Sequence, residues 1–451
     1  MFYFKKEIHM KKTGFFLLMA ISILLLQGCI EVKQSFSGPA PGIWRAVLQL
    51  EPDFITNNKK GEPLPEKLNM KFKDINENQL PFLFDVIYDD QGGFEIEIIN
   101  GTERIKVDEV RVGVDRTTAR DTIDMDFTIY DSTIKAVYRS GIMEGQWIVH
   151  SKKDYSIPFV AKYGKSERFT LQKEQPIMDV SGKWKVTFDA DTEDPYPAIG
   201  AFKQEGNHVS GTFITETGDY RFLDGTIQDN RLYLSCFDGS HAFLFEAQIN
   251  DKQEMKGQFR SGKHYKSYWE AVKDEDFSLR DPDSLTYMKE GYGELAFEFK
   301  NTKGEMISLD NEKFNNKVKI VQILGTWCPN CRDETEFLMD YLKKNPSDEV
   351  QIIALAFEKY RDEDKALKIL KTYKEKFNIP YDLCYAGYYN KKEAAKALPM
   401  LNAIISYPTM IFLDKTNNIK RIHTGFSGPA TSEFKEFSKE FKSYMDNLLK
   451  D

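Results

Sequence analysis

Apolar and polar residues alternate along much of the first two-thirds of the chain. Between Ile43 and about Ser278, short runs such as Phe94–Ile98 and Thr122–Phe127 carry an apolar residue at every second position. A period of two is typical of strands with one buried face. Turn signals such as Asp-Gly and Gly-Asn separate these runs at short spacing. Together they predict antiparallel sheet rather than parallel α/β structure.

The β-rich region also repeats itself. The motif Gly42–Val47 recurs at Gly182–Val186, and about eight short strands are expected in each copy, over residues 42–175 and 176–278. Eight strands suffice to close a small barrel and so remove exposed sheet edges. Two antiparallel, barrel- or sandwich-like β domains are therefore predicted, and one larger sandwich built from both copies is the alternative. Three tryptophans are expected in their cores: Trp44, Trp147 and Trp184.

After a linker near Phe277–Pro282, the pattern becomes that of an α/β domain, which we assign to residues 284–451. Val318–Leu324 is a continuous apolar-biased run, as in a strand covered on both faces. A hairpin is expected at Leu295–Leu309 and a C-terminal helix with Thr431 or Ser432 as its cap. Other helices are expected at about 330–344, 362–377 and 391–398, and other strands at 350–357, 381–385, 408–413 and 419–424.

The N-terminus has the pattern of a targeting segment. Lysines precede an apolar run, Phe15–Leu26, that is short for a membrane span, and Gly28-Cys29 follows. It resembles a bacterial lipoprotein signal (residues 1–28), with lipid carried on Cys29 and a tether at 29–41. This implies a protein of the cell envelope, lipid-anchored and facing the periplasm. An uncleaved membrane anchor with an incidental cysteine is the alternative.

Composition narrows the classes of function. The chain has 451 residues, more than one hydrophobic core of about 250–300 residues accommodates, so several domains are expected. A net charge of −8 and the lack of a Lys/Arg run beyond the N-terminus argue against nucleic-acid binding. Six scattered histidines form no metal-binding motif. We therefore predict no metal site and no cofactor.

The motif with chemistry is Trp327-Cys328-Pro329-Asn330-Cys331. It follows the predicted Val318–Leu324 strand and opens a helix, whose N-terminus favours a thiolate and lowers the pKa of the first cysteine. Cys328 is expected to be the exposed attacking thiol, and Cys331 the thiol that resolves a mixed disulfide. A zinc half-site or two core cysteines would be the structural alternative. Cys236 and Cys384 are expected as buried core residues.

Residues 294–451 resemble the thioredoxin fold and, more closely, the TlpA/ResA-type membrane-tethered thiol–disulfide oxidoreductases. The resemblance rests on Gly325–Cys331, Ser406–Thr409 and the hairpin before the core, and it covers about a third of the chain. It implies a cis-proline at Pro408 opposite the cysteines and a glutamate, Glu334, beside them. Glu334 would tune a thiol or carry a proton, or would only favour the helix dipole. Gln322 stands where cytoplasmic thioredoxins have a buried aspartate.

The leading hypothesis is a thiol–disulfide oxidoreductase that reduces disulfides in secreted client proteins. It would receive electrons from a membrane thiol donor, although the direction of electron flow stays open. A peroxiredoxin is disfavoured, because Val321 and Gly325 stand where its motif needs proline and threonine. The alternative from another class is a lipoprotein whose β modules bind a ligand or partner.

Overall fold

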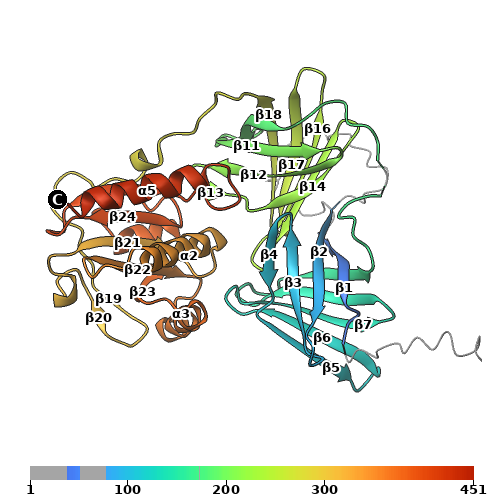
Figure 1. The fold of residues 1–451 in the computed structure, drawn as a ribbon, viewed down its shortest axis with the longest axis horizontal. Coiled ribbons are helices and arrows are strands. Elements are labelled where there is room, and N and C mark those ends of the chain that lie inside the picture. The colour runs from blue at the N-terminus through green and yellow to red at the C-terminus, as the bar shows by residue number, and fades with distance from the viewer. Residues whose placement is uncertain (1–37, 51–77, 172, 451) are drawn as a thin grey trace, which may run out of the picture. The chain divides into compact units, whose positions relative to one another are not determined.

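The computed structural model describes residues 38–50, 78–171 and 173–450. From Ala40 on, the described residues form one compact unit. In order along the chain, this unit contains an open β sheet, a closed β barrel and an α/β domain (Figure 1). The predicted signal and Cys29 lie outside the described residues. In the part of the chain that is described, no helix is long and apolar enough to cross a membrane.

The first β domain is a nine-stranded antiparallel sheet in the order β4-β3-β2-β1-β9-β8-β7-β6-β5. Its strands alternate as predicted, since Trp44, Ala46 and Leu48 of β1 are buried and the residues between them only partly so. Among the described strands, the outer pair β4 and β5 do not bond to each other, so the sheet is a half-barrel. The strands are β1 (Gly42–Gln49), β2 (Gln79–Tyr88), β3 (Phe94–Asn100), β4 (Glu103–Lys106), β5 (Glu109–Asp115), β6 (Arg120–Phe127), β7 (Ser132–Arg139), β8 (Ile142–Val149) and β9 (Ser156–Tyr163).

The second β domain closes on itself. Its order is β11-β10-β18-β17-β16-β15-β14-β12, with β13 on the far side of β12, and a pairing of β11 with β12 completes the ring. Aromatic rings fill the interior, with Phe213 and Phe245 stacked 4.5 Å apart between centroids. The strands are β10 (Gly182–Phe188), β11 (Tyr196–Glu205), β12 (His208–Thr215), β13 (Gly218–Asp219), β14 (Leu223–Gln228), β15 (Arg231–Phe237), β16 (Ala242–Ile249), β17 (Glu254–Ser261) and β18 (Tyr265–Lys273).

The two β domains share the local structure of the motif that recurs in the sequence. The indole N–H of Trp44 donates to Ala40 O at 2.9 Å, and that of Trp184 donates to Val180 O at 2.8 Å. In each domain the first strand pairs with the second and with the last, as β1 does with β2 and β9. Both tryptophans are buried, as is Trp147. That the second domain as a whole repeats the first stays a prediction.

The closed barrel covers the open sheet. Strand β15 is buried on both faces, with Leu234 and Cys236 in the barrel core and Phe237 in the other core. Phe237 stacks on Phe82 of β2 with 4.4 Å between ring centroids. Nine strands are described in each domain, counting the two-residue β13, against the expected number of about eight. The expectation of closure is wrong for the first domain, because its described sheet stays open. Its apolar face is buried against its neighbours instead, so closure is not needed to exclude water.

The alternative of one larger sandwich is also wrong, because the second sheet closes on itself into a barrel with its own core.

The α/β domain has a five-stranded sheet in the order β23-β22-β21-β24-β25, in which β21, β22 and β23 are parallel. Helix α2 packs on α5 through Phe337 and Phe441, with 4.9 Å between ring centroids. A short hairpin, β19 with β20, precedes the sheet. The elements are β19 (Phe299–Lys300), β20 (Met306–Ile307), β21 (Val318–Leu324), α2 (Pro329–Lys344), β22 (Val350–Glu358), α3 (Glu363–Phe377), β23 (Asp382–Tyr388), α4 (Lys391–Ala397), β24 (Thr409–Leu413), β25 (Ile419–Thr424) and α5 (Phe434–Leu448).

The predicted elements of this domain are confirmed to within a few residues, except for the cap of the last helix. Glu433 is the N-cap of α5 and makes no side-chain capping bond. Thr431, expected as a cap, instead donates its hydroxyl to Gly428 O at 2.9 Å, within the loop before the helix. The Thr431 hydroxyl is therefore used in a local turn and does not cap the helix.

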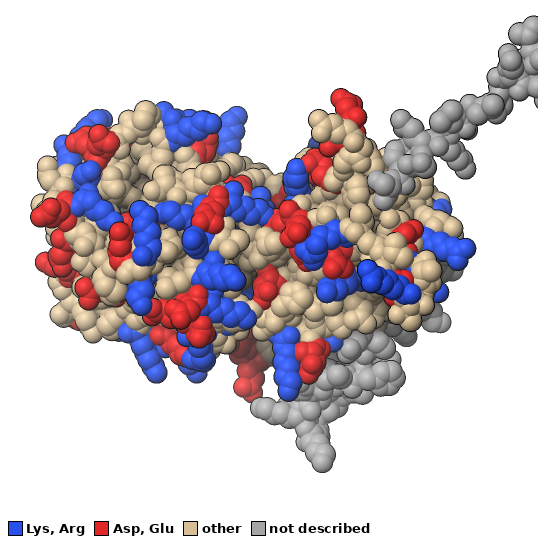
Figure 2. Space-filling model, turned by 90° about the horizontal axis from the view of Figure 1, so that it is seen from below, with Lys and Arg blue, Asp and Glu red and all other residues tan. Residues whose placement is uncertain are grey.

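Charges of both signs are mixed over the face in Figure 2, where Lys and Arg lie among Asp and Glu. Mixed charges largely cancel at a distance, so this face offers little long-range steering of a charged partner.

Candidate functional site

The two cysteines of the motif lie where β21 ends and α2 begins. Cys328 is the N-cap of α2, and its sulfur accepts a hydrogen bond from the Cys331 backbone N–H at 3.3 Å. A backbone donor and the helix dipole at this position both favour negative charge on that sulfur. Pro329 at the first helical position suits the helix start because its missing N–H would have no intrahelical partner. Both cysteines are free thiols in the structure.

Both thiols are buried. Cys328 is 8% exposed and Cys331 is fully buried. Burial, and then the hydrogen bond with Cys328, raise the pKa of the Cys331 thiol well above its usual value. Cys331 therefore stays protonated until its environment changes, which suits a thiol that reacts second. The expectation that Cys328 is exposed is wrong, because other parts of the chain cover it.

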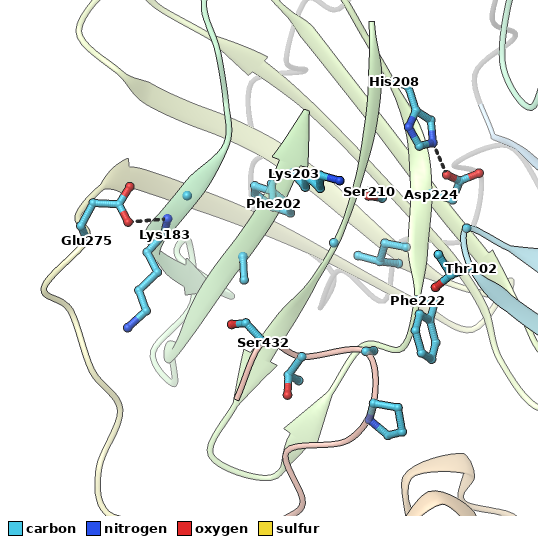
Figure 3. Close-up of a pocket in the computed structure, with 18 residues that line it drawn as sticks. Thr102, Lys183, Phe202, Lys203, His208, Ser210, Phe222, Asp224, Glu275 and Ser432 are labelled. Atoms are coloured by element: carbon cyan, nitrogen blue, oxygen red, sulfur yellow. Dashed lines mark hydrogen bonds and ion pairs between the residues drawn. The ribbon is translucent and has the colours of Figure 1, made fainter. Parts of the chain in front are cut away.

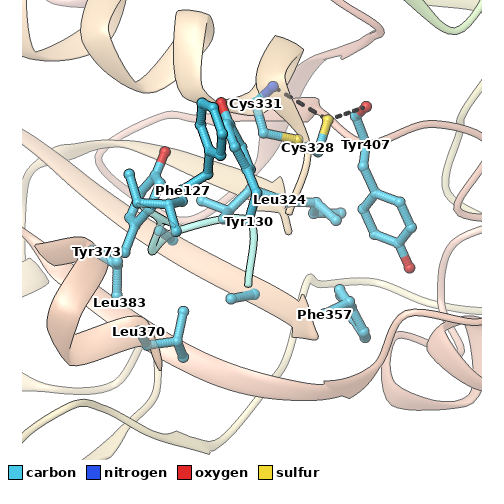
Figure 4. Close-up of a cluster of buried hydrophobic side chains, with 14 of the residues drawn as sticks. Phe127, Tyr130, Leu324, Cys328, Cys331, Phe357, Leu370, Tyr373, Leu383 and Tyr407 are labelled. Atoms are coloured by element: carbon cyan, nitrogen blue, oxygen red, sulfur yellow. Dashed lines mark hydrogen bonds between the residues drawn. The ribbon is translucent and has the colours of Figure 1, made fainter. Parts of the chain in front are cut away.

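The Tyr407–Pro408 bond lies opposite the cysteines and is cis, as the resemblance implies. The Cys328 thiol donates to Tyr407 O at 3.4 Å, so the loop before β24 contacts the attacking sulfur directly (Figure 4). The Tyr407 ring packs edge-on against Trp327, with 5.6 Å between centroids.

A buried acid lies beneath the pair. Glu334 is fully buried on α2, and its Oε2 accepts from the Gln322 amide at 2.9 Å. Burial raises the pKa of Glu334 well above its usual value, against the lowering effect of the hydrogen bond from Gln322. The other oxygen, Oε1, has no hydrogen-bond partner among the described residues. Gln322 therefore does not replace the missing aspartate itself but holds Glu334 in place.

A second buried glutamate fixes the loop that carries Trp327. Glu358, at the end of β22, accepts from the Thr326 backbone N–H at 2.9 Å and from its hydroxyl at 2.8 Å. Burial raises the pKa of Glu358. The sequence analysis missed this residue, and the only signal for it is a charged residue that ends an otherwise apolar strand.

The closed barrel covers the cysteine motif through a small set of contacts. The Asn330 side chain, between the cysteines, donates to Asp219 O at 3.0 Å. Ser240 donates its hydroxyl to Trp327 O at 2.9 Å, and Ser406, two residues before the cis-proline, donates to Thr217 O at 2.5 Å. We call residues 215–221 and 238–241 the barrel cover. No local pattern in the sequence points to these residues, because each acts on the site from another domain.

The first β domain contributes the remaining wall of the site. Figure 4 shows Phe127, the last residue of β6, and Tyr130, from the turn that follows, beside Cys331 and Tyr373. Both belong to the same buried cluster as the cysteines. The site is therefore enclosed by all three domains.

Arg221 connects the three domains electrostatically. It is 4% exposed, and one guanidinium nitrogen lies 2.6 Å from Glu103 of β4 in the first domain. Another pairs with Asp333 of α2. Burial raises the pKa values of both Glu103 and Asp333, against the effect of the Arg221 charge.

The other cysteines are in the cores, as expected. Cys236 and Cys384 are fully buried, and burial raises the pKa of each thiol. In the described residues, no group of three or more His, Cys, Asp or Glu could hold a metal ion.

The comparisons with known proteins bear on the α/β domain alone. The Redoxin family model matches residues 292–439, which include the five-stranded sheet, both cysteines and the cis-proline. The C-terminal domain is a thioredoxin-like Redoxin domain. No curated protein matches the chain.

Among the solved structures similar to part of this chain are three bacterial thiol–disulfide proteins. A thioredoxin-family thiol:disulfide interchange protein from Chlorobium tepidum is 19% identical, with 36% of this chain and 97% of that chain covered and a TM-score of 0.26. A secreted thiol-disulfide isomerase from Corynebacterium glutamicum is 20% identical (39% and 98% covered, TM-score 0.29). A thiol-disulfide oxidoreductase from Bacteroides fragilis is 24% identical (32% and 99% covered, TM-score 0.24).

Proposed function

We propose that the protein is a membrane-tethered, extracytoplasmic thiol–disulfide oxidoreductase that reduces disulfides in secreted client proteins. The observation that carries the proposal is the Cys328–Cys331 pair at the N-terminus of α2, opposite the cis-proline, in a Redoxin domain. The geometry makes one sulfur the acceptor of a backbone N–H and buries the other, so the two thiols differ in reactivity.

The reaction has two exchange steps. The Cys328 thiolate attacks one sulfur of the client disulfide, forms a mixed disulfide and releases the first client sulfur as a thiolate. Cys331 then gives up its proton and attacks the Cys328 sulfur, which forms the Cys328–Cys331 disulfide and releases the second client thiolate. Two electrons pass from the pair to the client. A membrane dithiol donor returns them by the same exchange in reverse.

Glu334 is a suitable acceptor for the Cys331 proton. Its charge acts on Cys331, and the pKa values of both groups are raised by the same dry environment. A raised pKa makes the Glu334 carboxylate a stronger base, so its ionised form can take the proton from Cys331.

Tethering through lipid on Cys29 would keep the protein beside its electron donor. The support is the sequence pattern at residues 1–29, and the periplasmic orientation is part of the same proposal.

The test is the reduction potential of the pair in the full chain, measured by equilibration in graded thiol buffers. We expect a value near about −270 mV, that of a reductase. A value at or above about −180 mV would mean an oxidant or isomerase and would overturn the proposed direction of electron flow, from the cysteine pair to the client. No reversible two-electron couple would overturn the enzyme assignment.

Trapping variants separate the two cysteine roles. Cys328→Ser should abolish reduction of insulin disulfides, whereas Cys331→Ser should accumulate a mixed disulfide with the client. Cys236 and Cys384 are retained in both variants as internal controls, and a mixed disulfide that forms on either of them would contradict the assignment.

A further inference from the structure

A pocket of about 490 Å³ lies where the two β domains meet the Redoxin domain. Aromatic side chains line it from each domain: Trp147 of the half-barrel, Phe259 of the closed barrel and Trp327 of the cysteine motif. Sites for small molecules typically enclose about 300–1,000 Å³ and have mostly apolar, aromatic walls. Because Trp327 directly precedes Cys328, the pocket adjoins the redox pair.

Two ammonium groups face this aromatic pocket. Lys152 lies 3.4 Å from the ring nitrogens of His264, and Lys359 lies 5.3 Å from the centroid of the Trp327 ring. Neither lysine forms an ion pair with a described residue. Glu358, the acid with the largest effect on Lys359, already accepts two hydrogen bonds from Thr326. Cys328, Asp131 and Asp238 act on Lys359 more weakly, and the two aspartates already bind Tyr360 and His241 respectively.

The positive charge in the pocket is poorly solvated. Burial, followed by repulsion from Lys359, lowers the pKa of Lys152 to about 8. Burial also lowers the pKa of Lys359. Lys152 is still mostly charged at pH 7, so two cations that repel each other share one partly dry space. An anion placed between them would relieve both the repulsion and the lost solvation.

A donor in the pocket also lacks an acceptor. Trp147 is 2% exposed, and its indole N–H finds no hydrogen-bond partner among the described residues. A buried, unsatisfied donor costs about 1–3 kcal/mol. An oxygen of a bound ligand would satisfy it.

A larger groove lies on the outside of the closed barrel, and several of its charged groups already have partners. It encloses about 650 Å³ (Figure 3). Its His208 lies 2.6 Å from Asp224, and Glu275 accepts from the Lys183 backbone N–H at 3.0 Å. Because these groups are already paired, a charged ligand would gain less in the groove than in the aromatic pocket.

We propose that the aromatic pocket binds a small anion with a flat conjugated ring, such as an aromatic carboxylate. The ring would stack among Trp147, Phe259 and Trp327. The carboxylate would pair with Lys152 and Lys359 in charge-assisted hydrogen bonds. This binding role is separate from the disulfide exchange and does not depend on it.

The test is isothermal titration calorimetry of the full chain with 2-naphthoate and with 2-naphthamide. The two probes share a ring, but only naphthoate is charged at pH 7. We expect saturable one-to-one binding of naphthoate, at least tenfold tighter than that of naphthamide. Lys152→Met and Lys359→Met should each weaken naphthoate binding about tenfold and leave naphthamide binding nearly unchanged. Trp147→Phe should weaken naphthoate binding severalfold.

Lys153→Met is the matched control, because Lys153 is exposed and adjacent in sequence but does not line the pocket. Lys152→Arg, which keeps the charge, should restore most of the affinity and so exclude misfolding as the cause. Equal binding of the two probes, no binding of naphthoate, or naphthoate binding that is indifferent to both lysine substitutions would overturn the proposal. Repeating the titration with Cys328→Ser separates it from the redox function, since affinity should not change.

Discussion

Glu334 is a carboxylic acid without contact to water, and it determines how the redox site responds to pH. Its folded-state pKa is raised by burial, whereas in the unfolded chain it lies near about 4.3. For an acid with a raised pKa, the contribution to stability is complete below the unfolded pKa and is lost as pH rises toward the folded pKa.

Glu334→Gln removes this titration and keeps the acceptor for Gln322. We expect the variant and the wild type to have similar free energies of unfolding near pH 4. Above that, the difference should grow in favour of the variant, by up to about 1.4 kcal/mol per pH unit, until the folded pKa is reached. Urea unfolding of both proteins between pH 4 and 8 measures this difference in the free energy of unfolding. The other buried acids titrate in both proteins, so they cancel in the comparison.

The same variant tests the proton role. Insulin reduction should slow at neutral pH and lose part of its pH dependence, because Cys331 loses its proton acceptor. A variant with an unchanged pH–rate profile would leave Glu334 with a structural role only.

At the scale of elements, the barrel cover controls access to Cys328. Cys328 is 8% exposed although it lies at a helix end, and Asn330 and Ser240 supply two of the bonds that hold the cover on the motif. If the proposed function holds, a client disulfide would reach the sulfur only after the cover moves away. Each of these hydrogen bonds contributes about 1 kcal/mol to the closed state.

Removing both bonds should therefore expose the thiol more often. For the Asn330→Ala, Ser240→Ala double variant we expect Cys328 alkylation by iodoacetamide to be at least about fivefold faster, measured by mass spectrometry of the modified peptide. Ser438→Ala is the matched control, since Ser438 donates only to Phe434 O within α5. If the double variant reacts at the rate of the wild type, the cover does not limit access.

At the scale of the whole molecule, Arg221 joins three domains through one buried guanidinium. Arg221→Met would leave Glu103 and Asp333 buried without their partner. Loss of one member of a buried ion pair costs about 3–5 kcal/mol. We expect a loss of stability in that range, measured by urea unfolding.

Arg280→Met provides the comparison, because Arg280 pairs with Glu216 at the surface with 70% of its side chain exposed. An exposed pair contributes about 0–1 kcal/mol. Equal effects of the two substitutions would show that the Arg221 cluster does not hold the domains together.

The proposed membrane attachment also belongs to the scale of the whole chain. If lipid on Cys29 is the anchor, Cys29→Ala should move the full-length protein from the membrane fraction to the soluble fraction of a bacterial host that processes lipoproteins. Immunoblots of the two fractions measure this. Retention of the variant in the membrane would favour the uncleaved anchor.

The sequence alone determined the elements whose signals are local. A period of two predicted the β region, and a continuous apolar run predicted Val318–Leu324 to the residue. The spacing of Cys328 and Cys331 after that strand predicted their place at a helix start, because backbone geometry within a few residues decides it.

Only the tertiary structure decided what depends on distant segments. The half-barrel stays open because the closed barrel covers its apolar face. The recurring motifs at Gly42–Val47 and Gly182–Val186 are alike, so they cannot predict that one sheet is open and the other closed. Cys328 is buried by contacts from residues about 90 to 110 positions away, such as Ser240 and Asp219. The aromatic pocket likewise exists only where three domains meet. Burial and pKa depend on which surfaces come together in space, and that information is not present in any short stretch of the chain.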